Sequence, residues 1–261
     1  MVQLVQTGDE LAKDRDFTYL ILSYCWGKGA SNSNARTTSS NLQSRLAGLD
    51  IETLPKTIQD AIFLTRLMRV KYLWVDATCI VQPEGPHDRG DWEAEADKMG
   101  DYYSNALCCI AASCASSSED GFLRPVPLGR YKLQEHIVPF MDKVGDEDYM
   151  FTELEPALDG SGTESYPLKR MEHPLMKRGW CLQERILSPC VLHWTWAGLF
   201  KECRSTPPPA ESERDGTAVD KKHILSLDKS EALGRRWFRL VEEYSRMDLT
   251  YPSDRCGLYG V

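Results

Sequence analysis

The sequence lacks the features that direct a chain into a membrane or out of the cell. None of its 261 residues lies in an uninterrupted apolar window of about 18 residues, the length that a transmembrane helix requires. Residues 1–16 are polar and charged, without the basic start and apolar centre of a secretory signal. We therefore expect a cytoplasmic protein that does not bind membranes.

The sequence also lacks an excess of positive charge. Lysine and arginine together number 31 against 39 aspartate and glutamate residues, which gives a net charge of −8. Binding to nucleic acid depends on clustered lysine and arginine side chains that neutralise phosphates. We therefore expect no nucleic-acid partner.

The nine cysteines follow neither a metal-binding nor a disulfide pattern. Their number is odd, no two have C-x-x-C spacing, and several lie in apolar runs, among them Cys79, Cys108 and Cys109. These features favour reduced, buried thiols. A structural zinc site and a cysteine–histidine hydrolase are the less favoured alternatives, so no metal site is expected.

Several common catalytic and nucleotide-binding motifs are absent. The chain contains no G-x-S-x-G, H-E-x-x-H, G-x-x-x-x-G-K-[ST] or G-x-G-x-x-G sequence. The stretch WGKGAS (26–31) has glycines but not the spacing of a phosphate loop, and we interpret it as the start of a flexible loop. Candidate functional residues must therefore come from the predicted fold.

The residues that are present predict strands and helices in alternation. Apolar runs without polar alternation predict buried strands at 18–24, 72–80, 107–113 and 190–196. Helical spacing predicts helices over 54–70, 92–106 and 178–188. This order is typical of an α/β fold in which helices cover both faces of a parallel sheet.

Two segments interrupt this alternation, and we expect one domain over 1–261 with its α/β core in 17–113 and 174–200. Residues 115–173 predict an insertion of short strands with a hairpin around 143–148. Residues 205–220 have the composition of a flexible linker. The segment 221–261 predicts a C-terminal helix over about 230–247, with Leu233, Trp237, Leu240, Val241 and Tyr244 on one face.

Polar residues follow the first predicted strand and interrupt the second. Ser23, Tyr24 and Trp26 come at the end of the first run, with Gly27 beside them, and Asp76 lies within the second. In open α/β sheets ligands bind at the carboxyl ends of the strands, which makes these residues candidates for a binding site. The alternatives are a structural cap or paired carboxylate for Asp76 and a core-closing aromatic for Trp26.

The helix over 178–188, RGWCLQERILS, places a carboxylate beside an indole. At about 100° per residue, Trp180 and Glu184 share one face, whereas Leu182 and Ile186 share another that we expect to face the sheet. A carboxylate next to an indole suits a cationic or hydroxyl-rich ring. The alternative is a surface Glu184 that pairs with Arg178 or Arg185.

Six segments together resemble the fungal heterokaryon incompatibility (HET) domain. They are YLILSYCWG (19–27), LPKTIQDAI (54–62), YLWVDATCIVQ (72–82), DWEAEADKMGDYYSNA (91–106), RGWCLQERILS (178–188) and YSRMDLTYPSDRCGLYG (244–260). The resemblance implies a role in fungal non-self recognition, an innate-immunity function whose activation leads to programmed cell death. It also implies a module that acts with receptor-like domains, in cis or in trans.

A more distant resemblance is to Toll/interleukin-1 receptor (TIR) domains, which have a flavodoxin-like fold. Their S-x-W-C-x-x-E segment is similar to 178–184 here, with Trp180, Cys181 and Glu184 in register and Arg178 in place of the small residue. The resemblance implies that Glu184 is the catalytic residue of an NAD⁺ glycohydrolase that works on self-association as a homo-oligomer. The insertion at 115–173 is not a TIR feature.

This resemblance implies a substrate site for NAD⁺ and no separate cofactor. We assign Ser23, Tyr24, Trp26, Gly27, Asp76, Arg178, Trp180 and Cys181 to substrate binding. Because many TIR domains are scaffolds, a non-catalytic signalling and oligomerisation module is the alternative. A buried ion pair between Arg178 and Glu184 would favour that alternative.

Overall fold

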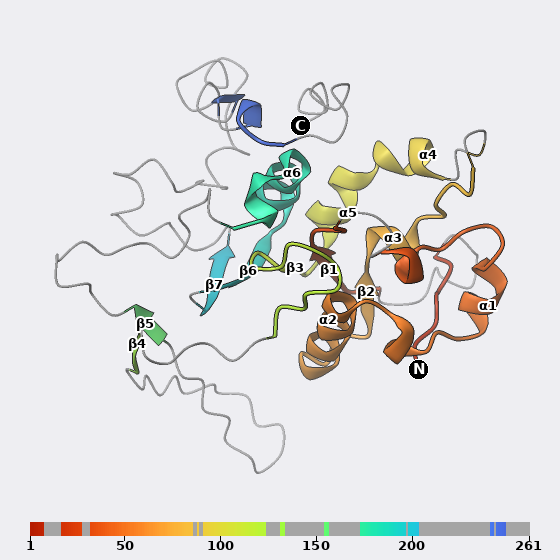
Figure 1. Cartoon of the computed structure of the whole chain (residues 1–261), viewed down its shortest axis with the longest axis horizontal. Coiled ribbons are helices and arrows are strands. Elements are labelled where there is room, and N and C mark those ends of the chain that lie inside the picture. The colour runs from red at the N-terminus through yellow and green to blue at the C-terminus, as the bar shows by residue number, and fades with distance from the viewer. Residues whose placement is uncertain are drawn as a thin grey trace, which may run out of the picture.

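The computed structural model of the chain contains a helix-covered sheet (Figure 1). It describes residues 1–7, 17–27, 32–85, 88, 91–123, 131–133, 154–156, 173–196, 198–203, 241–242 and 244–248. The linker expected at 205–220 lies outside these residues, as do most of the expected insertion and most of the expected C-terminal helix. Within the described part, no helix is long and apolar enough to cross a membrane.

Five strands form the central sheet, in the order β2-β1-β3-β6-β7. They are β1 (Tyr19–Ser23), β2 (Tyr72–Trp74), β3 (Cys108–Ala111), β6 (Cys190–Thr195) and β7 (Gly198–Cys203). The first four are parallel, which confirms the predicted α/β fold and its parallel strands. The fifth, β7, was not predicted, and its antiparallel pairing with β6 makes the sheet mixed.

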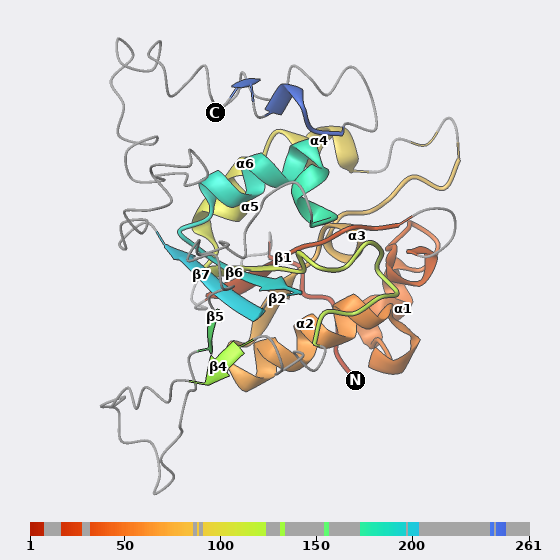
Figure 2. The same cartoon turned by 60° about the vertical axis from the view of Figure 1, so that its left-hand side comes forward.

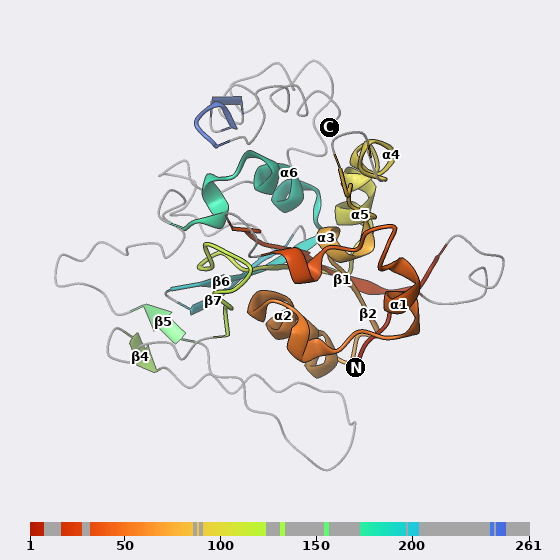
Figure 3. The ribbon, with the colours of Figure 1, turned by 45° about the vertical axis from the view of Figure 1, so that its right-hand side comes forward.

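Helices cover both faces of the sheet, as the uninterrupted apolar strands predicted (Figure 2). On one face lies α2 (Lys56–Leu67), whose Ile58 and Ala61 pack in a core with Leu20, Leu22 and Ile110. On the other lie α5 (Met99–Asn105) and α6 (Gly179–Leu187), as Figure 3 also shows. Their core joins Met99 and Cys181 to Ile21, Cys109 and Val191. The central strands β1 and β3 are therefore buried on both sides.

The helix predicted over 92–106 is two helices. The chain forms α4 (Trp92–Ala96), turns at Asp97 and Lys98, and continues as α5. Asp97 and Lys98 are both exposed, so these two residues make no buried apolar contact that would keep α4 and α5 as one straight helix. The prediction of a single helix is wrong, although Met99 and Tyr103 of the predicted stripe are buried.

Asp76 does not lie inside a strand, which corrects a second expectation. Strand β2 ends at Trp74, and Asp76 begins the short helix α3 (Asp76–Cys79). Its carboxylate accepts a hydrogen bond from the backbone N–H of Ala77 (2.6 Å), which satisfies a donor that this first turn leaves without a helical partner. Cys79 in turn is exposed, whereas the sequence predicted it to be buried.

The remaining elements are short. They are the 3₁₀ helices Ser33–Ala35, Ile51–Thr53 and Leu175–Lys177, the helix α1 (Leu42–Ala47), and the strands β4 (Tyr131–Leu133) and β5 (Leu154–Pro156). The last two pair antiparallel within the predicted insertion, but the expected turn at 143–148 lies outside the described residues. Residues 115–123, where the insertion was expected to begin, pack on α2 through buried Phe122.

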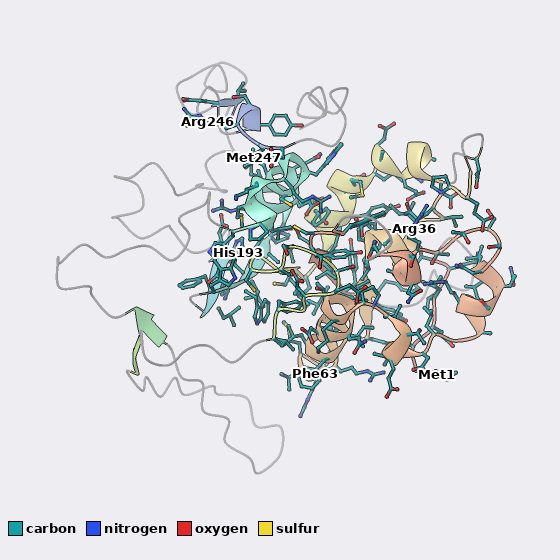
Figure 4. The ribbon with its side chains drawn as sticks, in the orientation of Figure 1. Met1, Arg36, Phe63, His193, Arg246 and Met247 are labelled. Carbon is teal, nitrogen blue, oxygen red and sulfur yellow. The ribbon has the colours of Figure 1, made fainter. Side chains whose placement is uncertain are left out.

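A buried polar network ties α6 to the mixed edge of the sheet. Arg185 of α6 donates to Glu202 of β7, with 2.6 Å between Nε and Oε2. The same oxygen lies 3.1 Å from Nε2 of His193 on β6, whose Nδ1 is 3.3 Å from the Ser113 hydroxyl. His193, labelled in Figure 4, is fully buried. This network fixes the helix that carries Glu184.

Candidate active site

The carboxyl end of β1 contacts the middle of α6. The Ser23 hydroxyl donates a hydrogen bond to Oε2 of Glu184 and lies 4.0 Å from the sulfur of Cys181. Ser23 and Cys181 are buried, whereas Glu184 is half-buried. The contact joins positions separated by 161 residues, and it places a carboxylate at the strand ends where α/β sheets bind ligands.

Arg178 lies at the start of α6 without forming an ion pair with Glu184. Its Nη1 donates to the backbone carbonyl of Tyr24 at 2.6 Å. Among the described residues, the ion-pair partner of Arg185 is Glu202, so neither arginine pairs with Glu184. The alternative of a surface Glu184 bound to Arg178 or Arg185 is therefore wrong. The positive charge of Arg178 still favours the ionised form of Glu184, and it opposes the net rise in the pKa of Glu184.

Asp76 and Trp26 form a second part of the site. The indole Nε1 of Trp26 donates to Oδ2 of Asp76 at 2.9 Å, and both residues are half-buried. Buried Tyr24, two residues before Trp26, links this part to Arg178 because its carbonyl accepts from that guanidinium. Its hydroxyl donates to Oδ1 of Asn32 at 3.3 Å. Asp76 also accepts from the backbone N–H of Ala77, which fits the structural role considered for it, while its binding role stays a prediction.

Burial dominates the electrostatics of both carboxylates. Burial raises the pKa of Glu184, and the charge of Asp76 adds to this rise, while the Ser23 hydroxyl and Arg178 oppose it. Burial likewise raises the pKa of Asp76, against the hydrogen bonds from Ala77 and Trp26 and the charge of Arg178. Two carboxyls with raised pKa values around one guanidinium are typical of functional sites.

Tyr103 belongs to the site although sequence reasoning placed it only in an apolar stripe. It is buried in α5 beneath the end of β1, and its hydroxyl lies 3.4 Å from the carbonyl of Leu22. Burial, followed by the charge of Glu184, raises the pKa of Tyr103 well above its usual value. The available signal was a phenol on a face that otherwise carries apolar residues, which indicates a polar atom to be satisfied inside the core.

A comparison with known protein families finds one matching family. Its description is Heterokaryon incompatibility protein (HET), and the match covers residues 19–184, which is more than half of the chain. The chain belongs to the HET family. The match begins with the first residue of β1 and ends at Glu184, so it includes both sides of the contact between Ser23 and Glu184. No curated protein and no solved structure matches this HET domain.

The orientation of α6 in the HET domain differs from the one expected. Leu182 and Ile186 are buried, but the side chains of α6 that meet the sheet are Cys181, Glu184 and Arg185. The helix is therefore turned so that its polar stripe faces β1 and β7. The reason is that each polar group finds a hydrogen-bonding partner there, Ser23 for Glu184 and Glu202 for Arg185.

The other predicted site residues take different positions in the HET domain. Trp180 is half-buried, one turn before Glu184 on α6. Gly27 follows Trp26, is exposed, and has a φ of 88°, a left-handed conformation that favours glycine. Cys25, which was not predicted, is buried near the Arg178 charge, and burial raises the pKa of its thiol. The described residues contain no group of three side chains that fits a metal ion.

Proposed function

We propose that this HET domain cleaves NAD⁺ to nicotinamide and ADP-ribose, with Glu184 as the catalytic residue. The observation that carries the proposal is the half-buried Glu184 carboxylate, held by the Ser23 hydroxyl at the carboxyl end of β1. The raised pKa of Glu184 supports it, because a carboxylate that has lost water interacts more strongly with a cationic substrate. Self-association switches the domain on and leads to cell death.

One carboxylate is enough for this reaction. Most glycosidases need a second carboxylic acid because the leaving oxygen must be protonated. The nicotinamide ring of NAD⁺ is already cationic and leaves as a neutral molecule, so the bond breaks without a general acid. Glu184 stabilises the positive charge that develops on the ribose, and water then adds to the ribose to complete the hydrolysis.

The neighbouring residues provide the binding contacts. Arg178 brings the positive charge that suits the NAD⁺ phosphates, and it is held by its bond to the Tyr24 carbonyl. Asp76, fixed by Trp26, provides an acceptor for a ribose hydroxyl. The rings of Trp26 and Trp180 are partly exposed and suit stacking on the flat rings of NAD⁺. NAD⁺ is the substrate, and the reaction needs no further cofactor.

The strand order supports a flavodoxin-like, and hence a TIR-like, core. The four parallel strands run β2-β1-β3-β6, and this is the order 2-1-3-4 of flavodoxin-like sheets. In such sheets the connection after β1 leads to β2 on one side, and the following connection leads to β3 on the other side of β1. This reversal opens a crevice beside the carboxyl ends of β1 and β3. Ser23 is the last residue of that strand.

The test is release of nicotinamide, measured by chromatography after incubating concentrated protein with NAD⁺. We expect release by the wild type and none by Glu184→Gln, which keeps the shape of the side chain and removes its charge. The matched control is Glu242→Gln, which removes an exposed carboxylate outside the site and leaves release unchanged. If the wild type releases nothing even when clustered on a fused oligomer, the proposal is wrong.

The second candidate is a non-catalytic signalling module that acts by oligomerising. It is favoured by three exposed apolar side chains on the outer side of α2 and at its end, Phe63, Leu67 and Met68. Figure 4 shows Phe63 directed away from the molecule. Loss of self-association on changing these residues, together with no nicotinamide release by clustered wild type, would establish this second function.

A further inference from the structure

Three cysteines lie side by side across three neighbouring strands. Cys190 begins β6 and is the register partner of Cys203, the last residue of β7. On its other side, the register of Cys109 with Val191 places Cys108 next to Cys190. This row lies at the opposite end of the sheet from Ser23. Cys108 is the register partner of Leu20 near the start of β1, whereas Ser23 at the end of β1 is the partner of Ala111.

The pair of Cys190 and Cys203 has the backbone geometry that a disulfide requires. The last pair of the β6–β7 hairpin is Thr195 and Gly198, which are three positions apart in the chain, and a pair with this spacing is of the hydrogen-bonded type. Pair types alternate along an antiparallel ladder, so Cys190 and Cys203, five pairs further out, are of the non-hydrogen-bonded type. Their Cα atoms are then about 4.5 Å apart, within the disulfide range of about 4.4–6.8 Å.

The two cysteines also share a face of the sheet and are accessible. Cys190 packs on the α2 side with Leu192 and Trp194, the next residues along β6 that point the same way. Directly paired residues of antiparallel strands point to the same face, so Cys203 lies on that side as well. Both are half-buried, whereas Cys108 is buried.

Cys108 has a different character from its two neighbours. Cys108 is buried, so a small disulfide reaches it less easily than the other two, and the adjacent Cys190 thiol and burial raise its pKa. The described residues contain no group of three or more cysteine, histidine or acidic side chains that could hold a metal ion. Thiol–disulfide exchange between the two accessible cysteines is the chemistry that remains.

We propose that Cys190 and Cys203 form an oxidation site that takes a low-molecular-weight disulfide such as glutathione disulfide. One cysteine, as its thiolate, attacks the small disulfide, forms a mixed disulfide and releases one thiol. The second cysteine, also as its thiolate, attacks the protein sulfur of the mixed disulfide, forms the Cys190–Cys203 bond and releases the second thiol. The small disulfide is reduced to two thiols, and the two cysteines lose two protons and two electrons. The site does not depend on the proposed NAD⁺ chemistry.

The test uses the folded full-length chain and glutathione disulfide. After incubation, remaining thiols are blocked with N-ethylmaleimide, the protein is unfolded and digested, and cross-linked peptides are identified by mass spectrometry. We expect a peptide pair joined through Cys190 and Cys203. Cys203→Ser should instead keep glutathione on Cys190, and Cys79→Ser, which removes an exposed thiol in α3, should leave the cross-link unchanged.

The wild-type digest decides the matter even if a variant fails to fold. Recovery of Cys190 and Cys203 as blocked thiols would overturn the proposal. So would a cross-link of either residue to Cys108 or to Cys256, because the register predicts that Cys203 is the partner of Cys190.

Discussion

At the scale of single residues, Arg178 opposes the effect of burial on the two carboxylates of the site but does not overcome it. Its guanidinium lowers the pKa of both Glu184 and Asp76, yet its hydrogen bond goes to the Tyr24 carbonyl. Burial nevertheless prevails, and both pKa values are raised. Glu184 is therefore a carboxylate that accepts from the Ser23 hydroxyl and has no ion pair among the described residues, which leaves it able to interact with a substrate cation.

The raised pKa of Glu184 predicts a pH-dependent stability. A raised pKa means that the folded state binds the proton more tightly than the unfolded state, so stability falls as pH rises from about 4.3 through the folded pKa. We expect the free energy of unfolding of Glu184→Gln to depend less on pH over this window, and to equal or exceed that of the wild type at neutral pH. Urea unfolding across the pH range measures both, and a variant that is less stable at neutral pH would assign Glu184 a structural role.

Trp26→Phe tests the hydrogen bond to Asp76. Phenylalanine keeps an aromatic ring but removes the indole N–H, so Asp76 loses one of its hydrogen-bond donors. We expect a loss of about 1–3 kcal/mol in the free energy of unfolding, measured in urea. Trp196→Phe is the matched control, because Trp196 is exposed and its change should stay within about 0.5 kcal/mol. Equal effects of the two changes would contradict the prediction.

At the scale of elements, α6 and β7 depend on each other through Glu202. Glu202→Ala leaves the buried Arg185 cation without its counter-charge, and we expect a loss of about 3–5 kcal/mol in the free energy of unfolding. Glu242→Ala removes one member of an exposed ion pair with Arg246 and should cost at most about 1 kcal/mol. Thermal or urea unfolding compares the two, and a small effect of Glu202→Ala would show that the network does not hold α6.

Sequence patterns predicted the four parallel strands but missed the antiparallel strand β7. Strands β1 and β3 read as apolar runs because both of their faces are covered, and residues such as Leu20 and Ile110 leave no ambiguity. Strand β7 escaped prediction because it lies at the edge of the sheet, where Leu199 and Lys201 are exposed and no clear alternation remains. Asp76 was misplaced because periodicity does not reveal that the strand ends at Trp74, two residues before the carboxylate.

The sequence predicted the part of the site that lies at the strand ends and on one helix. Ser23 and Glu184 follow from the rule that ligands bind at the carboxyl ends of strands and from the resemblance of 178–184. The rotation of α6 was missed because helical spacing gives relative directions on a helix and not the direction of the sheet. Tyr103 was missed because its partner, Glu184, is distant in sequence and only the packing of α5 on α6 brings them near.

At the scale of the whole molecule, the exposed apolar residues of α2 predict self-association. We expect the wild type to form larger species as its concentration rises, measured by size-exclusion chromatography with light scattering, and Phe63→Ser/Leu67→Ser to stay monomeric. Leu107→Ser is the matched control, because it removes another exposed apolar side chain away from α2. If the double variant and the wild type form the same species at every concentration, the exposed face of α2 does not mediate self-association.

The position of β6 in the sheet has a consequence for the chain while the ribosome makes it. Ile110 of β3 pairs with Leu192 of β6, which is 82 positions later. At about 5–20 residues per second, the outer edge of β3 stays without its neighbour for roughly 4–16 s of synthesis. During that time the nascent chain presents an open apolar strand, so slow translation or crowded polysomes should favour capture by chaperones or by a second nascent copy.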